Sequence, residues 1–383
     1  MDNPVTERGS FPLMADVRDF FWKDKVFLVA FILAVISVIF GRFETKFFDY
    51  KVIFTVFGLM LVIGGFKSTG LLRYMGQSLV KRSQTTRQLV RFTTMLTFFM
   101  AIFFTNDLTI LTVLPLYLTI TKDVTDRRSV YIGAALILPA VHLGSSLFPF
   151  GNPHNLYAYS FFHMNNLEFF KGTGLLFIAG FIVLNLAVQF FISNEPFTIN
   201  TQVDAFDKVE ATLYTLLMAL MAASVFGWIS YMYAAAITAV VVLFHKPKLF
   251  AEVDYHLLLT FVCFFLIVGN IVSIKPITEL ISAAFVGPHT SFLGTVLVSQ
   301  VISNISSTVL ISPFTTHGMS VLLGADIGGI GTVVASMATL ISYKIIMVAA
   351  RSEAKGFAKY FAYINTIFFI IFTIIGLGIV SIL

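Results

Sequence analysis

Two asparagine-centred motifs in this chain share their residue types and their spacing. Thr105-Asn106-Asp107 is followed by Pro115, and Ser303-Asn304-Ile305 is followed by Pro313. The distance from the asparagine to the proline is the same in both copies, 115 − 106 = 9 and 313 − 304 = 9. Each copy interrupts a long apolar stretch. In a membrane protein, paired polar interruptions in the two halves of a chain point to the binding site of a transporter.

The motif residues can bind ions of either sign. The amides of Asn106 and Asn304 can donate to an oxyanion and accept from a cation or a hydroxyl. Asp107 can hold a coupling proton or Na⁺, because a carboxylate inside a membrane costs about 3 kcal/mol and is by default functional. The alternative for all three is capping of a helix N-terminus, which for the asparagines is compatible with binding. A possible Na⁺ site comprises Asn106, Asp107 and Asn304.

Two further segments combine helix-breaking residues with polar side chains. The first contains Gly144-Ser145-Ser146 and then Gly151-Asn152-Pro153-His154-Asn155, and the second runs from the glycine-rich segment 324–329 to Ser336 and Thr339. Glycine frees the backbone and Pro153 removes a donor, so each helix should unwind there. The exposed N–H ends of broken helices attract anions and their carbonyl ends attract cations.

Three titratable residues near these breaks have alternative interpretations. His154 is either a proton relay or a structural histidine. Asp326 either lines the site or caps a half-helix. His142 is a weaker candidate, and its separation from His154 does not resemble a zinc spacing. The predicted substrate- and ion-binding residues are Thr105, Asn106, Asp107, Thr109, Gly151, Asn152, Pro153, His154, Asn155, Ser303, Asn304, Ser306, Ser307, Thr308, Ser336 and Thr339.

Composition places these motifs in a polytopic membrane protein. Of 383 residues, 57% are hydrophobic and 12% are charged, against about 25% charged in soluble domains. The basic residues fall between apolar runs, where they act as topology signals, so nucleic acid is not expected as a partner. The single Cys263 excludes a disulfide framework. No Walker motif is present, which argues against a primary pump, and no bound cofactor is expected. Neither a His-Glu-x-x-His nor a Gly-x-Gly-Asp motif occurs, so an intramembrane enzyme is disfavoured.

The apolar segments predict an all-α protein with an inverted-topology repeat. Continuous spans are expected at 26–40, 51–66, 172–192, 210–226, 228–244, 254–273 and 360–382, of which the first two are short for a crossing and should extend into their flanks. Segments 91–121 and 289–318 read as re-entrant helical hairpins, and 129–164 and 319–350 as discontinuous helices. Segments 71–90 and 276–287 should lie along the interface as amphipathic arms.

Loop charges orient these elements. The segment 67–91 holds six basic and no acidic residues, so it should be cytoplasmic, with the N-terminus inside and the C-terminus outside. The hairpins then enter from opposite faces. The predicted parts are a cytoplasmic segment 1–25, a first repeat 26–192, a cytoplasmic loop with a linking helix 193–227, and a second repeat 228–383.

These motifs resemble the ion transporter superfamily. Phe104-Thr105-Asn106-Asp107, the Gly151-to-Leu156 segment and Ser303-Asn304 are most similar to the arsenite/antimonite and sodium/proton antiporter branch and its bacterial "anion transporter" relatives. The symporter relatives carry Ser-Asn-Thr at both tips, and the antiporter branch shares Asn-Asp at the first. The resemblance implies an elevator-type carrier, often a homodimer, in a bacterial cytoplasmic membrane.

Several functions remain open from the sequence. The leading expectation is a secondary active transporter of a small anion or metalloid oxyacid, coupled to H⁺ or Na⁺. A Na⁺/H⁺ antiporter without an anion site is the first alternative, and a dicarboxylate or citrate symporter the second. A channel is disfavoured, because a carboxylate at one tip alone suits alternating access better than a symmetric pore. Since Ile305 stands where Asp107 stands in the first copy, ion coupling is expected on the 105–107 side and solute contacts on the 303–308 side.

Overall fold

The computed structural model describes residues 25–196, 203–349 and 351–383, and within these ranges the secondary structure is helical apart from one isolated bridge between Thr85 and Pro196. The predicted N-terminal segment 1–25 lies outside the described residues except for its last position. Part of the predicted cytoplasmic loop, 197–202, lies outside them too.

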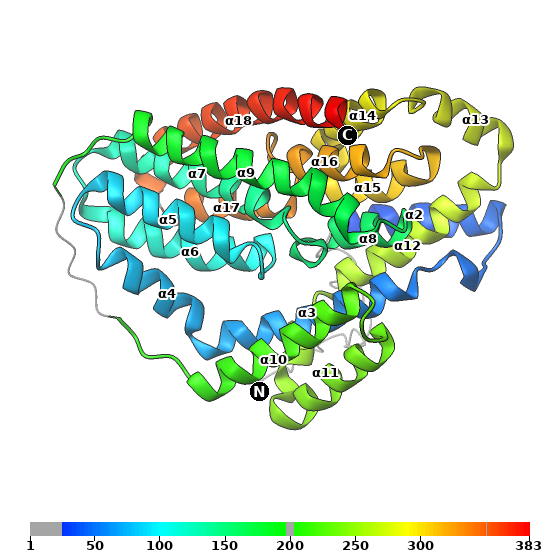
Figure 1. Ribbon diagram of the computed structural model, residues 1–383, viewed down its shortest axis with the longest axis horizontal. Helices are drawn as coiled ribbons and strands as arrows, with labels where there is room; N and C mark the ends of the chain where they lie inside the picture. The colour runs from blue at the N-terminus through cyan, green and yellow to red at the C-terminus, as the bar shows by residue number, and fades with distance from the viewer. Residues whose placement is uncertain (1–24, 197–202, 350) are drawn as a thin grey trace, which may run out of the picture.

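The helices follow the predicted order along the chain (Figure 1). In the first half they are α2 (Lys25–Phe40), α3 (Tyr50–Thr69), α4 (Leu71–Val80), α5 (Thr86–Met100), α6 (Asn106–Ile120), α7 (Arg127–Ser145), α8 (Pro153–Phe161) and α9 (Asn166–Phe191). In the second half they are α10 (Lys208–Val225), α11 (Tyr231–His245), α12 (Tyr255–Val272), α13 (Lys275–Ala284), α14 (Pro288–Ile302), α15 (Asn304–Ile311), α16 (Gly318–Gly328), α17 (Met337–Ala349) and α18 (Ala354–Ile382).

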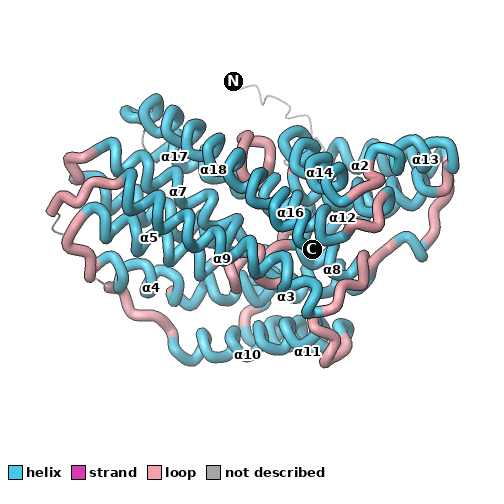
Figure 2. The backbone as a smooth tube through the Cα atoms, turned by 45° about the horizontal axis from the view of Figure 1, so that its top comes forward, coloured by secondary structure: helices cyan, strands magenta, loops and turns pink. Residues whose placement is uncertain are grey.

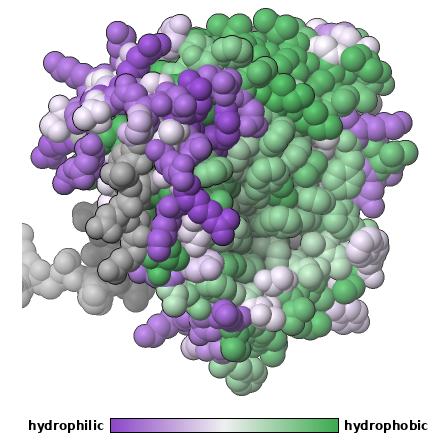
Figure 3. All heavy atoms as spheres, turned by 60° about the vertical axis from the view of Figure 1, so that its left-hand side comes forward, coloured by the Kyte–Doolittle hydropathy of each residue, from purple (hydrophilic) through white to green (hydrophobic). Residues whose placement is uncertain are grey.

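Five of the described helical segments are long and apolar enough to cross a bilayer by themselves: α3, α9, α10, α12 and the segment ending in α18. The helices α13 and α14 bend by 98° at their junction and together pass the same test. Figure 3 shows hydrophilic side chains gathered at the end of the molecule where α5 and α7 begin, and apolar side chains over the neighbouring flank. Such apolar flanks suit contact with lipid.

The helices form two packed groups (Figures 1 and 2). In one, α3 packs against α10 and α11, and α2 packs against α12. In the other, α5 packs against α7 and α9, and α14 packs against α16 and α18. The hairpin helix α6 contacts α17, while α15 contacts α8. The helix that follows each break therefore contacts a helix from the other half of the chain.

Glycines permit the closest helix contacts in the second group. A Cβ on Gly144 would lie 2.0 Å from the carbonyl oxygen of Phe98, and a Cβ on Gly324 would lie 2.8 Å from that of Phe292. Both contacts join a hairpin helix to the helix that precedes a break. An alanine at either position would force the two backbones apart.

The helix boundaries correct two sequence expectations. Gly324–Gly328 is the last part of α16 rather than unwound, and the break begins at Gly329. The reason is that Gly324 serves the close packing of α16 on α14, not chain flexibility. The first span does not lengthen at its C-terminal end, since α2 stops at Phe40, whereas α3 extends to Tyr50–Thr69.

Candidate functional site

Four helices begin around one cavity. The first residues of α6, α8, α15 and α17 all line a space of about 400 Å³. Each of these helices follows a break that ends another helix nearby: α5, α7, α14 and α16. The N-terminal N–H groups of a helix have no partner inside the helix and carry a partial positive charge. The cavity is therefore bordered by four sources of positive potential without a basic side chain at either hairpin tip.

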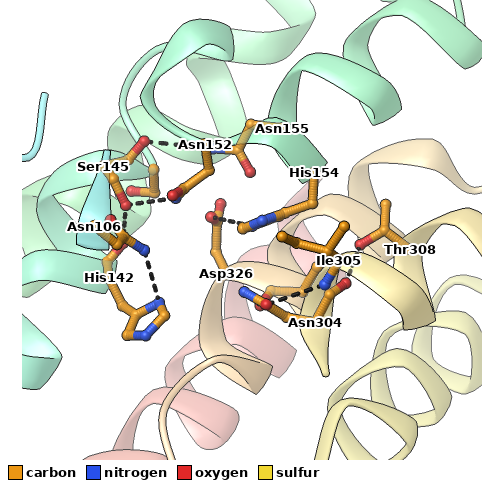
Figure 4. Close-up of polar contacts among 12 residues, drawn as sticks. Asn106, His142, Ser145, Asn152, His154, Asn155, Asn304, Ile305, Thr308 and Asp326 are labelled. Carbon is orange, nitrogen blue, oxygen red and sulfur yellow. Dashed lines mark hydrogen bonds and ion pairs between the residues drawn. The ribbon is translucent and has the colours of Figure 1, made fainter. Parts of the chain in front are cut away.

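A chain of side chains joins the first hairpin tip to the second break, and Figure 4 shows its first contact, between Asn106 and His142. Asn106 Nδ2 lies 3.3 Å from His142 Nδ1, and His142 Nε2 lies 3.0 Å from Ser336 Oγ. Ser336 Oγ is 2.8 Å from Thr339 Oγ1, which donates to the Gly329 carbonyl at 3.1 Å. Because the Asn106 amide nitrogen is a donor, His142 accepts at Nδ1 and donates from Nε2. Buried His142 thereby fixes the orientation of Asn106.

The second hairpin tip is fixed mainly by the backbone. Asn304 N donates to the Ala335 carbonyl at 2.9 Å, and Asn304 Nδ2 donates to the Ala325 carbonyl at 3.4 Å. Asn304 Oδ1 accepts from the Ile305 amide at 3.0 Å. Ser303, immediately before it, has φ of 80°. A non-glycine residue at positive φ is strained, and such strain is concentrated at functional sites.

A buried contact between a histidine and an aspartate links the two halves of the chain. His154 Nε2, in the first turn of α8, lies 3.1 Å from Asp326 Oδ1, in the last turn of α16. The side chains are 1% and 0% exposed. His154 lines the cavity, whereas Asp326 lies behind it.

Asp107 is the half-buried carboxylate of the cavity. Among the described residues, its side chain has no hydrogen bond or ion pair. The same cavity is lined by Lys67, Glu252 and Asp254. Lys67 Nζ and Glu252 Oε2 form a 3.1 Å ion pair, with 59% and 46% of their side chains exposed, so the cavity reaches solvent at this pair.

The predicted site residues separate into two sets. Those that line the cavity are Thr105, Asn106, Asp107, Asn152, Pro153, His154, Asn304 and Ser336. Those that do not are Thr109, Gly151, Asn155, Ser303, Ser306, Ser307, Thr308 and Thr339.

The second set supports the cavity wall from behind. Thr308 and Ser307 donate to the Asn304 carbonyl, and Asn155 donates to the Ser145 carbonyl. A Cβ on Gly151 would lie 2.2 Å from that same Ser145 oxygen. Thr109 and Ser306 are buried on their helices.

Sequence reasoning placed Ser145 in a helix break without a role in this support, and it missed Gln300. Ser145 accepts from the Asn152 amide and donates to the His142 carbonyl. Gln300, near the end of α14, donates to the Gly328 carbonyl at 2.7 Å and accepts from the Thr332 amide at 2.9 Å. A polar residue four positions before Asn304 in an apolar stretch was the available signal for Gln300.

The possible Na⁺ site is partly compatible with the observed geometry. Asn106, Asp107 and Asn304 all line the cavity. Asn106 Oδ1 is buried without a hydrogen bond and Asp107 is unpaired, so both could accept a hard cation. Asn304 Oδ1 already accepts from the Ile305 amide. Groups of three or more His, Cys, Asp or Glu side chains that could hold a metal are absent from the described part of the chain.

Comparison of the sequence with known proteins places this chain among transporters. The chain is 29% identical to the uncharacterized transporter MJ0456 of Methanocaldococcus jannaschii over 299 residues, 78% of this chain and 81% of that protein. It is 24% identical to the inner membrane protein YbiR of Escherichia coli over 301 residues, 78% and 80% of the two chains. The crystal structure of the YdaH transporter of Alcanivorax borkumensis aligns with a TM-score of 0.47 at 14% identity, over 86% of this chain and 85% of that one. Residues 23–322 match the family model described as citrate transporter, so the chain belongs to the citrate transporter family (CitMHS), a family of membrane transporters and not of enzymes.

Proposed function

We propose that this protein is a secondary active transporter that moves a small anion, either an organic carboxylate or a metalloid oxyacid, and couples its movement to H⁺ or Na⁺. The observation that carries this proposal is the convergence of the N-termini of α6, α8, α15 and α17 on one cavity. Helix N-termini bind carboxylate and oxyanion groups through N–H groups that have no partner inside the helix. At α15 the N–H groups of Asn304 and Ile305 already donate to the Ala335 carbonyl and to Asn304 Oδ1, so this helix contributes chiefly through its dipole. A volume of about 400 Å³ accommodates a small anion.

Asp107 supplies the coupling to a cation. Its carboxylate is unpaired within the described residues and faces the cavity beside the α6 N-terminus. A bound proton or Na⁺ would remove its repulsion of an incoming anion. Cation and anion would then bind cooperatively, which is the thermodynamic requirement for symport.

The transport cycle proposed here is alternating access by an inverted repeat. Supporting it, the contacts of α5 with α7 and α9 correspond to those of α14 with α16 and α18. In the same way, the packing contact between α2 and α12 corresponds to the packing contact between α11 and α3. We assign the hairpins and broken helices to a moving body, α2, α3 and α10–α12 to a scaffold, and α4 and α13 to connecting arms, in an elevator-type homodimer of a bacterial cytoplasmic membrane.

The second candidate function is a Na⁺/H⁺ antiporter. The specific observation in its favour is the acidic lining of the cavity, where Asp107, Glu252 and Asp254 outnumber Lys67. In this mechanism Asp107 would exchange the two cations and the helix N-termini would serve only as structural ends.

Proteoliposome flux separates the two candidates. Purified full-length chain is reconstituted and given a pH gradient with and without Na⁺, in the presence of citrate, succinate, arsenite, phosphate or sulfate. We expect uptake of at least one of these anions, and this uptake should depend on the cation gradient. Na⁺-dependent proton movement without uptake of any of these anions would favour the antiporter.

A further inference from the structure

One face of α3 forms a wall of the cavity and ends in a lysine. The residues of α3 that line the cavity recur at helical spacing, so they lie on one side of the helix. They are Val56, Leu59, Met60, Ile63, Gly64 and Lys67. All of them except Lys67 are apolar or lack a side chain. Lys67 lies in the last turn of α3, where the cavity reaches solvent, so an ion that enters along this wall passes Lys67 first.

Lys67 is the one lysine or arginine that lines the cavity in the described part of the chain. The acidic residues that line it are Asp107, Glu252 and Asp254. The tip residues Asn106 and Asn304 are buried, so the helix N-termini lie deeper than the exposed Lys67. An approaching anion therefore finds a mostly acidic lining, in which Lys67 is the attractive formal charge nearest to solvent.

The ion pair of Lys67 is of a kind that an anion can open. Lys67 Nζ lies 3.1 Å from Glu252 Oε2, and both side chains are about half exposed. Exposed ion pairs contribute little to stability, because water competes for both charges. The packing of α3 on the 3₁₀ helix η4 (Pro247–Glu252) also has an apolar basis, since buried Leu249 packs beside Gly64. The lysine can therefore exchange its partner without loss of that packing.

The neighbouring acidic side chains are bound elsewhere. Asp254 caps α12 and accepts from the Leu257 amide at 3.0 Å. Glu210 Oε1 and Oε2 each accept from Lys246 Nζ at 3.3 Å. Among the described residues, Glu252 is therefore the acidic group that competes with an anion for Lys67.

From this arrangement we propose that Lys67 is an entry subsite, at which the anion replaces Glu252 before it reaches the hairpin tips. A lysine ammonium acts as a point charge, so the subsite selects by charge and not by shape. Its exposure keeps binding weak, which suits an entry site, because the ion has to leave it again. The inference deepens the proposed function, on which it rests, by naming the residue that selects anions at the mouth.

The subsite should serve one side of the membrane only. Lys67 and Glu252 belong to α3 and to η4, which lies between the scaffold helices α11 and α12, whereas Asn106 and Asn304 lie on the hairpins. In the proposed cycle the hairpins move away from Lys67 when the cavity faces the other side. Lys67 then contributes to anion entry from its own side and not from the opposite one.

Charged thiol reagents test the subsite without any transported ligand. The full-length chain carries Cys263→Ala, which removes its one cysteine, and Ile305→Cys, which places a thiol in the cavity. In inside-out vesicles at low ionic strength, the anionic sulfonatoethyl methanethiosulfonate is compared with the cationic trimethylammonioethyl reagent. Each labelling rate is divided by the rate of the same reagent with a small free thiol. Lys67→Gln should lower the anionic-to-cationic ratio about fivefold, and Glu252→Gln should raise it about fivefold, because each removes one charge at the mouth.

The opposite signs separate anion capture from a structural ion pair, whose loss would act in the same direction in both variants. Lys67→Arg keeps the charge and should keep the wild-type ratio. Lys246→Gln is the matched control, because it breaks a Lys–Glu pair outside the cavity, and the ratio should stay within about twofold of wild type. An unchanged ratio in Lys67→Gln, a change of the same sign in both variants, or no reaction of Ile305→Cys with either reagent overturns the inference.

Uptake measured from each side tests the same subsite during transport. In inside-out vesicles Lys67→Gln should raise the KM for the transported anion about tenfold with little change in kcat. In right-side-out vesicles its KM should equal that of the wild type. An equal rise from both sides contradicts the entry role. Failure of every anion in the flux assay would reject the proposed function, whereas the labelling ratio decides the entry subsite without a transported anion.

Discussion

At the scale of single residues, Asp107 connects the local structure to ion coupling most directly. It lies in the first turn of α6, where the helix dipole favours its charge, and it faces the cavity unpaired among the described residues. We expect Asp107→Asn to lower cation-dependent anion uptake at least about tenfold, because the neutral amide no longer exchanges a charge with the bound cation.

The measurement for Asp107→Asn is initial uptake in proteoliposomes with and without the cation gradient. Asp123→Asn is the matched control, because it removes an exposed carboxylate outside the cavity. Gradient-driven uptake by Asp107→Asn equal to that of the wild type would contradict the assigned role.

Gly329 lies so close to two site residues that a side chain at this position would not fit. A Cβ there would lie 2.5 Å from His142 Cε1 and 2.8 Å from Asn304 Nδ2, so both side chains would have to move. Gly329→Ala should therefore weaken anion binding about tenfold or more, measured by ligand-dependent thermal unfolding. Gly174→Ala on α9, where nothing lies within 4 Å, is the control and should bind normally. Equal binding by both variants would show that this contact is not required.

At the scale of elements, the break between α16 and α17 depends on a side chain from another helix. Gln300 on α14 donates to the Gly328 carbonyl and accepts from the Thr332 amide. Gln300→Ala leaves both backbone groups without these partners and should reduce the free energy of unfolding by about 1–3 kcal/mol.

Thermal or denaturant unfolding in detergent measures this effect. Gln300→Glu should also destabilise the protein, because a carboxylate cannot donate to the Gly328 carbonyl. Gln189→Ala removes a glutamine that contacts Arg91 at the exposed surface, and should change stability by no more than about 0.5 kcal/mol. A Gln300→Ala protein as stable as Gln189→Ala would refute the role in holding the break.

The positions of the helices could be predicted from the sequence better than the side-chain contacts that hold those helices together. Apolar length and the Gly and Pro positions placed the helix pairs α5–α6, α7–α8, α14–α15 and α16–α17 close to their observed bounds. The re-entrant path of the two hairpins stays a prediction. The second break was misplaced because a glycine that allows close helix packing, such as Gly324, has the same sequence signal as one that unwinds a helix. His142 could not be ranked above other histidines, since its partners Asn106 and Ser336 are brought to it only by the tertiary fold.

At the scale of the whole molecule, the cavity opens at the Lys67–Glu252 pair, on the side to which loop charges assign the cytoplasm. The single cysteine, Cys263, is buried, so a Cys263→Ala background suits accessibility labelling. In that background Ile305→Cys, which lines the cavity, should react with a membrane-impermeant maleimide in inside-out vesicles. Val309→Cys, fully buried one turn later on α15, should not react.

Labelling of both positions at equal rates would contradict the described cavity. Labelling of Ile305→Cys from the outer side alone would contradict the orientation. Protection of Ile305→Cys by a bound anion is expected as well, because the side chain lies beside Asn304 at the second tip.

The central claim is that four helix N-termini form an anion site whose occupancy is linked to a cation. The most direct measurement is thermal unfolding of the purified chain titrated with citrate, succinate and arsenite at matched ionic strength, with and without Na⁺ and at two pH values. We predict that at least one anion raises the unfolding temperature, and that Na⁺ or a lower pH increases the apparent affinity for that anion about tenfold, a coupling of about 1.4 kcal/mol. Stabilisation by Na⁺ or protons alone, with none of these anions having an effect under any condition, would contradict it.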